Sequence, residues 1–126
     1  MIEVYNKKKK RIGFIKGRKY FDKKHRLIGY LEGNVVKNQK GRPLLKLDSH
    51  DDIISGGEQI GFILDSKIYI REVPIFEVSK EKREIYSNQR KKIISLKGNH
   101  QKIEDLDYFG IAAIYFESEW VLKLIE

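Results

Sequence analysis

The chain has 126 residues, a length that suits one domain with one modest core. It is 40% hydrophobic and 35% charged, which is a globular composition, and the absence of cysteine excludes disulfides, thiolate catalysis and zinc sites built on Cys. The net charge of +8 is uneven, because residues 1–50 hold fifteen Lys/Arg against four Asp/Glu and residues 51–126 hold eleven against fourteen. This asymmetry fits a polyanionic partner, or attraction between the two halves within one chain or between subunits.

Neither a leader nor a membrane span is expected. The N-terminus carries a basic run at residues 7–11 but lacks the apolar stretch of a signal peptide. No segment approaches the roughly 20 apolar residues that cross a bilayer. We therefore expect a soluble, cytoplasmic protein with no membrane partner.

The first half of the chain carries a sixteen-residue repeat. Residues 12–15 read Ile-Gly-Phe-Ile, residues 28–31 read Ile-Gly-Tyr-Leu and residues 60–63 read Ile-Gly-Phe-Ile. Residues 44–47, Leu-Leu-Lys-Leu, fill the vacant register without the glycine and the aromatic residue. A second column keeps the same step through Val4, Tyr20, Val36 and Ile68, with Asp52 as its exception. This agreement between columns indicates a true repeat.

Each repeat unit is typical of a β-hairpin. A β-branched or aromatic pair and the tetrad containing glycine both have strand composition. Gly17 and Gly33 suit turns that need positive φ, whereas Asp22 and Asn38 open turns that their side chains can cap. The glycine inside the tetrad indicates a bulge or the close approach of another backbone. Four units begin near residues 4, 20, 36 and 52, and they must stack or close into a ring.

Two further strands and a helix are expected after the fourth unit. A trailing strand is predicted near residues 68–70, and another over residues 73–78, where Pro74 indicates an edge or a bend. Residues 80–97 are polar and lysine-rich, with spaced apolar residues near one helical face. With Ser79 as N-cap and a stop at residues 98–99, this stretch is predicted to be a helix.

Residues 106–116 form the most apolar stretch of the protein. Its paired alanines, and Asp105 or Asp107 as a cap, favour a buried helix, whereas Gly110 and the aromatic residues favour a strand. Periodicity does not separate the two for a short apolar run. We expect a helix that plugs the open face of the repeat or forms an oligomer interface.

The predicted fold is mainly β, in the α+β class. Four β-hairpin repeats form a quasi-fourfold meander, and one or two C-terminal helices follow. Residues 1–126 make a single domain, in which the β-repeat region 4–78 is covered by the C-terminal segment 79–126.

Catalytic and metal-binding patterns are weak. His25, His50 and His100 lack ligand or triad spacing, and residues 56–57, Gly-Gly, are too short for a phosphate cradle. The densest polar cluster lies in the degenerate third repeat and consists of Asp48, His50, Asp51 and Asp52. Such carboxylates suit a hard cation such as calcium, but the sequence favours a solvated turn, because loops collect Asp and Ser for turn chemistry alone. No cofactor, metal or catalytic residue is predicted.

A basic and aromatic stretch over residues 5–46 offers the sharpest alternative. Aromatic rings on a sheet can stack bases while flanking cations neutralise phosphates. However, the rings fall at repeat positions where a core is expected, and the cations fall mostly in turns. The candidate polyanion-binding residues are Lys16, Arg18, Lys19, Lys23, Lys24 and Arg26.

The repeat, with Asn or Asp before one turn and glycine in the next, resembles that of the small bacterial 4-fold β-flower proteins. The resemblance covers about residues 4–70 and departs from the pattern at residues 44–47 and at Asp52. It implies a quasi-fourfold β arrangement and an uncharacterised activity, with no site residues to transfer.

Two functions are therefore open. The first is a non-enzymatic β-repeat module that binds a protein partner or forms a homo-oligomer. The alternative is a basic nucleic-acid-binding protein. The degenerate third repeat is where we expect a functional site to lie.

Overall fold

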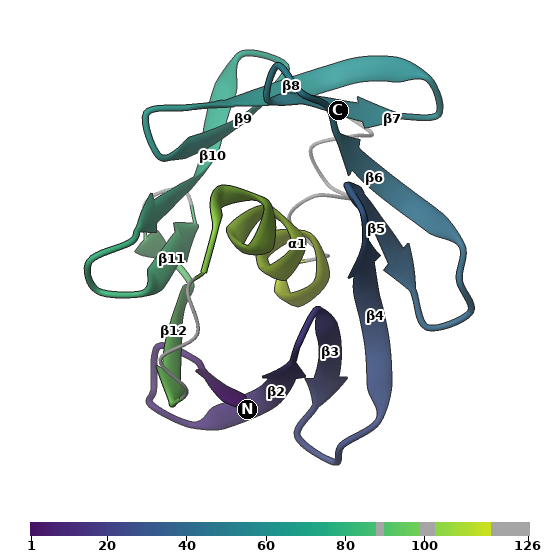
Figure 1. Cartoon of the computed structure of the whole chain (residues 1–126). Coiled ribbons are helices and arrows are strands. Elements are labelled where there is room, and N and C mark those ends of the chain that lie inside the picture. The colour runs from purple at the N-terminus through teal and green to yellow at the C-terminus, as the bar shows by residue number, and fades with distance from the viewer. Residues whose placement is uncertain (88–89, 99–102, 117–126) are drawn as a thin grey trace.

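The sixteen-residue unit folds as a β-hairpin, as predicted, and hairpins continue around a complete ring. A computed structural model describes residues 1–87, 90–98 and 103–116 as twelve strands in a closed antiparallel barrel and one helix (Figure 1). The elements are β1 Ile2–Tyr5, β2 Arg11–Lys16, β3 Lys19–Asp22, β4 Leu27–Glu32, β5 Val35–Asn38, β6 Pro43–Leu47, β7 Asp52–Ser55, β8 Glu58–Leu64, β9 Lys67–Ile70, β10 Val73–Ser79, β11 Glu84–Ser87, β12 Ile93–Gly98 and α1 Asp105–Tyr115. The mainly β class is confirmed.

Each strand pairs with the next one in sequence, and the ring closes between its first and last strands. Val4 of β1 lies opposite Leu96 of β12 in an antiparallel register. Consecutive strands therefore make six hairpins, so the predicted quasi-fourfold arrangement is not confirmed. Closure leaves the barrel without an open sheet edge.

One inward-facing residue from every second strand lies in the most deeply buried part of the core. These six residues are at most 1% exposed, and they are Val4, Tyr20, Val36, Ile53, Ile68 and Ile85. The predicted column contained Asp52, but the structure places Ile53 there. Val36 and Ile53 are one residue further apart than the sixteen-residue step of the repeat, which explains the apparent exception at Asp52. Ile53 and Ile68 are one residue closer than that step.

The glycines of the tetrads allow close approach, as their position in the strands predicted. A Cβ atom on Gly13 would collide with the carbonyl oxygen of Phe21 and would lie 2.8 Å from the Tyr115 hydroxyl. A Cβ atom on Gly29 would lie 2.5 Å from the side chain of Ile114. The two glycines thus make room both for the next strand and for α1. The strand pairs also shift register at the predicted bulges, after Val4 and Tyr20.

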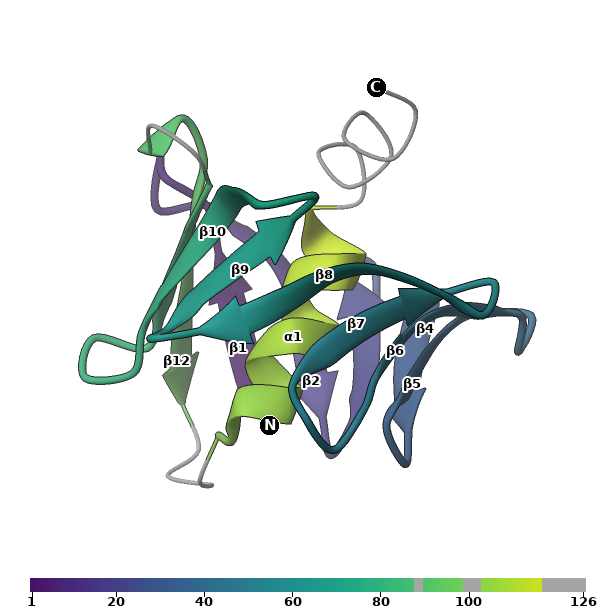
Figure 2. The same ribbon diagram turned by 90° about the horizontal axis from the view of Figure 1, so that it is seen from above.

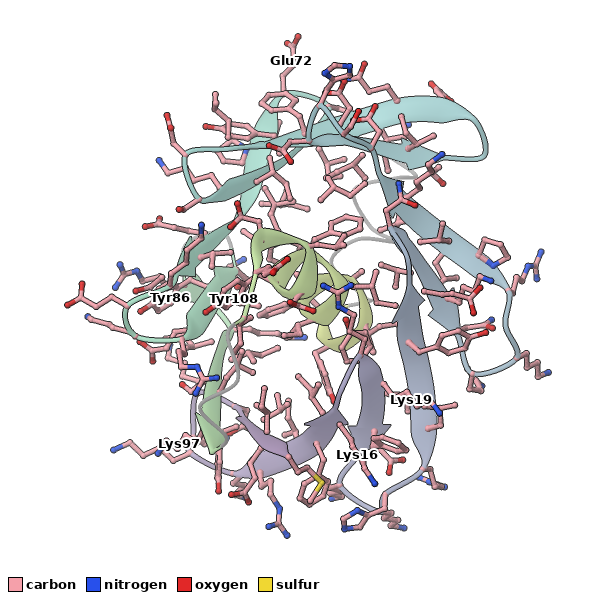
Figure 3. All side chains as sticks on the ribbon, viewed as in Figure 1. Lys16, Lys19, Glu72, Tyr86, Lys97 and Tyr108 are labelled. Atoms are coloured by element: carbon pink, nitrogen blue, oxygen red, sulfur yellow. The ribbon has the colours of Figure 1, made fainter. Side chains whose placement is uncertain are left out.

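The apolar stretch near the C-terminus is a helix, as expected, and it lies inside the barrel (Figure 2). Residues 108–113 are all buried, because the barrel wall surrounds the helix. Figure 3 shows side chains filling the ring around α1, with Tyr108 inside it and Glu72 projecting away from it. A helix buried on all sides has no polar face, which is why its periodicity was ambiguous.

The predicted helix over residues 80–97 is wrong. This segment forms β11 and β12, the sixth hairpin, with Ile85, Ile94 and Leu96 facing the core. Ser79 does cap a turn, since its Oγ accepts from the backbone N–H of Lys82 at 3.3 Å, but no helix follows. This segment forms strands because it pairs with β10 and β1. Those neighbouring strands satisfy the backbone N–H and C=O groups that a helix would have to satisfy within the segment.

The two strands predicted after the fourth unit are confirmed as β9 and β10. The register of β10 shifts between Pro74 and Phe76, as expected for a proline at a bend. Among the described residues there is one helix rather than two, and no described helix is long and apolar enough to span a membrane.

Candidate functional site

The connections of the barrel fall into two groups, one at each end. Because consecutive strands are antiparallel, successive connections alternate between the ends. The connections that follow β1, β3, β5, β7, β9 and β11 share one end, which we call the basic end. Those that follow β2, β4, β6, β8 and β10 share the other, which we call the opposite end.

Charge is divided very unequally between these ends. The described residues connecting strands at the basic end include thirteen Lys and Arg and one acidic residue, Glu72. Those at the opposite end include four basic and four acidic residues. A surface of one sign concentrates anions and speeds their association. The basic end is therefore the principal candidate site.

Three connections at the basic end share one conformation, sixteen residues apart. The side-chain oxygen of Asn6 accepts the backbone N–H groups of Lys8 and Lys10, each at 3.0 Å. Asp22 and Asn38 repeat this pair of bonds with the residues two and four positions later, at 2.9 Å. The residue three positions after each cap has positive φ: Lys9, His25 and Gly41. These caps fix the backbone that displays the lysines.

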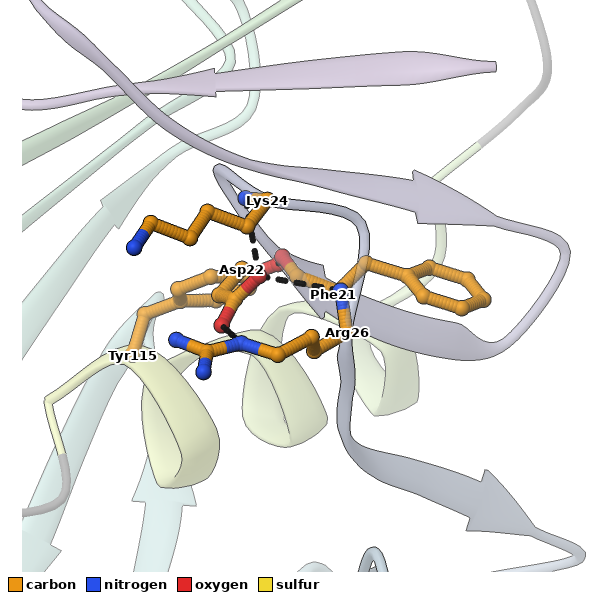
Figure 4. Close-up of polar contacts among 5 residues, drawn as sticks. All are labelled: Phe21, Asp22, Lys24, Arg26 and Tyr115. Carbon is orange, nitrogen blue, oxygen red and sulfur yellow. Dashed lines mark hydrogen bonds and ion pairs between the residues drawn. The ribbon is translucent and has the colours of Figure 1, made fainter.

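At the second of these loops, the cap is charged. The Asp22 carboxylate accepts a further bond from Arg26 Nε at 2.8 Å, and Tyr115 approaches the same turn from α1 (Figure 4). Hydrogen bonds from the backbone of Arg26, its side chain and the backbone of Lys24 hold the pKa of Asp22 below its ordinary value, although partial desolvation opposes the shift.

A pocket opens at the basic end, where the first and last strands meet. Its volume is about 410 Å³. The lining residues are Asn6, Lys7, Lys8, Ile12, Lys91, Lys92, Ile93, Ile94, Tyr115 and Phe116. Among the described residues, four lysines and no acidic residue thus line this pocket beside an apolar surface. The lysines come from two segments, residues 7–8 and 91–92, and the lining as a whole comes from three segments that are far apart in the sequence.

The candidate polyanion-binding residues are divided between the two ends. Lys23, Lys24 and Arg26 belong to the basic end, but Lys16, Arg18 and Lys19 lie toward the opposite end. Arg18 is moreover paired with Asp107 of α1, with Nε 2.9 Å from Oδ1. The structure therefore does not gather these six residues into one patch.

Other basic residues of this end were missed as site residues, although a signal for them was present. Lys8, Lys24 and Lys40 occur sixteen residues apart, in every second turn of a meander. Such turns lie at the same end. The contribution of Lys91 and Lys92 was hidden by the helix predicted for residues 80–97.

The cluster Asp48, His50, Asp51 and Asp52 forms a fourth loop of the same kind. Asp48 Oδ1 accepts the backbone N–H groups of His50 and Asp52, each at 2.9 Å, which lowers the pKa of Asp48. This loop lies at the opposite end of the barrel, away from the basic end. The hydrogen bonds of Asp48 show that the cluster caps a turn. In the described part of the chain, no group of three or more His, Asp or Glu side chains is arranged to hold a metal ion.

Half-buried aromatic residues lie on the outer face of the wall, contrary to the core position expected for them. Of the first five aromatic residues, Tyr20 and Phe14 are buried, whereas Tyr5, Phe21 and Tyr30 are half-buried. Lys97 Nζ lies 5.1 Å from the centre of the Tyr5 ring. Phe14 is buried beneath Arg11, at 4.6 Å, and stacks on His25 at 4.2 Å. Cations and histidine therefore already cover two of these rings.

The remaining histidines are His50 and His100. His50 is exposed in its loop, and His100 lies outside the described residues. Desolvation is the chief cause of a raised pKa at three tyrosines, the buried Tyr20 and Tyr108 and the partly buried Tyr115. The Tyr115 hydroxyl donates toward the carbonyl oxygens of Phe21 at 2.8 Å and Phe14 at 3.1 Å. Its role is to anchor α1 to the wall.

Comparison with known proteins gives no relative from which to transfer a function. No protein-family model, no curated protein and no solved structure matches this chain, so its function is argued from its own residues.

Proposed function

We propose that this protein is a non-enzymatic binding module that holds nucleic acid at the basic end of the barrel. The observation that carries the proposal is the division of charge, with thirteen basic residues and one acidic residue among the described connections of that end. Phosphate contacts supply most of the affinity in sequence-independent nucleic-acid binding.

The capped conformation of the loops also supports nucleic-acid binding at the basic end. Side-chain caps at Asn6, Asp22 and Asn38 hold three loop backbones in one shape, so that Lys8, Lys24 and Lys40 occupy equivalent positions. A fixed backbone reduces the conformational entropy lost when the side chains bind. Because cations already cover the rings of Tyr5 and Phe14, the arrangement favours phosphate contact over base stacking on the wall.

The test is binding of fluorescently labelled single-stranded and duplex oligonucleotides, followed by anisotropy over a range of salt concentrations. With about six phosphates contacted, the slope of log affinity against log salt should be about −5 for duplex and about −4 for single strands. No binding at low salt would overturn the proposal.

Matched variants locate the interface. Lys24→Glu/Lys40→Glu should weaken binding at least about tenfold at low salt and reduce the salt slope by about 2. Lys16→Glu/Lys19→Glu carries the same change in net charge toward the opposite end and should have a much smaller effect. Equal losses in the two variants would show that net charge, not the basic end, governs binding.

Head-to-tail self-association is a second candidate. At the opposite end, a pocket of about 470 Å³ is lined in part by Asp48, Asp51, Glu104 and Asp105. These carboxylates complement the basic end of another copy, which is the geometry of a heterologous interface. Light scattering at high protein concentration tests this candidate, and a clean monomer removes it.

We also infer that strands β1 to β8 derive from four copies of one hairpin. The equivalent caps at Asn6, Asp22 and Asn38 and the glycines of three tetrads support this origin. The likeness to 4-fold β-flower proteins and the cytoplasmic location remain predictions.

A further inference from the structure

The seam where the barrel closes carries a built pocket. It lies between the loop that precedes β2 and the loop that precedes β12, which are neighbours because β1 pairs with β12. Lys7 Nζ donates to the carbonyl oxygen of Arg90 at 3.4 Å and so links the two loops. The C-terminal end of α1 supplies Tyr115 and Phe116 as part of the lining.

The apolar surface of this pocket is held in place from several directions. The single hydroxyl proton of Tyr115 is shared between the carbonyl oxygens of Phe21 in β3, at 2.8 Å, and Phe14 in β2, at 3.1 Å, which fixes the side chain to both strands. Phe116 packs against Phe76, with ring centres 4.8 Å apart, and is 1% exposed. Ile12 and Ile93 complete the apolar lining from the two walls. A surface fixed in this way is suited to an apolar or aromatic ligand body.

The rim has the opposite chemistry. Lys7, Lys8, Lys91 and Lys92 border the pocket, and none of the lining residues that the structure describes is acidic. Like charges beside a wall of low dielectric constant repel one another, and they concentrate field on an incoming anion. The volume of about 410 Å³ falls in the range of small-molecule sites.

We propose that this pocket binds a nucleoside phosphate, either free or as the terminal nucleotide of a strand. The phosphate contacts the lysine rim, and the base lies on the apolar surface that includes Tyr115. For a strand end as ligand, the proposal rests on the function proposed above. The pocket would add a preference for the ends of nucleic-acid strands, which the charge of the loops alone would not give.

The direct test is titration of a fluorescently labelled nucleoside monophosphate into the full chain. The monophosphate should bind at least about tenfold more tightly than the corresponding nucleoside, because charge-assisted contacts to phosphate are lost in the latter. Inorganic phosphate should compete only weakly, since it lacks the base. Equal affinity for nucleoside and monophosphate, or no binding of the monophosphate at millimolar concentration, would overturn the proposal.

Two double variants separate the pocket from the rest of the basic end. Lys8→Glu/Lys91→Glu should abolish monophosphate binding, whereas Lys24→Glu/Lys40→Glu should leave it within about twofold. All four side chains are exposed, and thermal unfolding verifies that both variants keep the fold. The pocket assignment fails when the two variants lose monophosphate binding equally.

The source of the ligand is decided with oligonucleotides that carry or lack a terminal phosphate. A tenfold preference for the phosphorylated end, lost in Lys8→Glu/Lys91→Glu, identifies strand ends. Binding of free monophosphate without end preference identifies the free nucleotide. Oligonucleotide binding with neither property would overturn the pocket proposal while leaving the proposed function intact.

Discussion

The two ends of the barrel use the same kind of loop for different purposes. At the basic end, capped loops present lysines that have few acidic neighbours. At the opposite end, two of the basic residues hold α1, since Arg18 pairs with Asp107 and Lys80 pairs with Asp105. The ion pairs at the opposite end compensate charge within the fold, whereas the described connections of the basic end carry a net excess of positive charge that an anionic partner can meet.

The helix is also anchored differently at its two ends. Its first turn is held by ion pairs and by a capping box between Glu104 and Asp107. Its last turn is held by the Tyr115 hydroxyl, which occupies space left by Gly13. Packing anchors the helix at the basic end, and electrostatics contribute most at the opposite end.

The largest effect on stability is expected where packing anchors the helix. Gly13→Ala places a Cβ atom against the Phe21 carbonyl oxygen and the Tyr115 side chain. We expect a loss of about 3 kcal/mol in the free energy of unfolding, measured by urea denaturation. Gly33→Ala is the control, because a Cβ atom at this position meets no other atom within 4 Å. Its only cost is the positive φ of residue 33, about 1 kcal/mol in the free energy of unfolding. Equal losses would remove the close-approach argument.

Removal of the Tyr115 hydroxyl should have the next largest effect. Tyr115→Phe keeps the ring but leaves the carbonyl oxygens of Phe14 and Phe21 without this donor. The expected cost is about 2 kcal/mol, independent of salt, because no charge is involved. Denaturation at low and high salt measures it. A cost that disappears at high salt would contradict packing and neutral hydrogen bonding as the anchor.

A smaller and salt-dependent effect is expected at the opposite end. Arg18→Gln removes the ion pair with Asp107, whose side chain is 14% exposed while that of Arg18 is 40% exposed. We expect a loss of about 1 kcal/mol at low salt that shrinks at 1 M salt as screening increases. A loss that is unchanged by salt would mean that Arg18 acts through packing of its stem.

The smallest effect concerns acid stability of the capped loops at both ends. Hydrogen bonds lower the pKa of Asp22 and of Asp48 below the ordinary value of 3.8, so their stabilisation is complete above that value. It is lost as pH falls through the lowered pKa of the folded protein. The variant Asp22→Asn/Asp48→Asn keeps the capping oxygens, as Asn6 and Asn38 do. Its stability should therefore fall less steeply below pH 4, measured by thermal unfolding, and an unchanged slope would contradict the assignment.

The local pattern of the chain was readable because it is set by short-range chemistry. Hairpins, capped turns and strand glycines each leave a mark within one sixteen-residue unit, and β9, β10 and α1 were also predicted in the right places. The segment 80–97 was misread because its apolar residues fit both a helical spacing and a strand spacing. Its strand state depends on partners, β10 and β1, that lie outside the segment.

By itself, therefore, the sequence determined the hairpin unit, its capped loops, the apolar character of the C-terminal segment and the excess of basic residues. Tertiary structure alone decided that twelve strands close into a ring, because closure joins residues more than ninety positions apart, such as Val4 and Leu96. The same closure brings Lys8 and Lys91 to one pocket. Proximity of this kind depends on the path of the whole chain, and no local pattern records it.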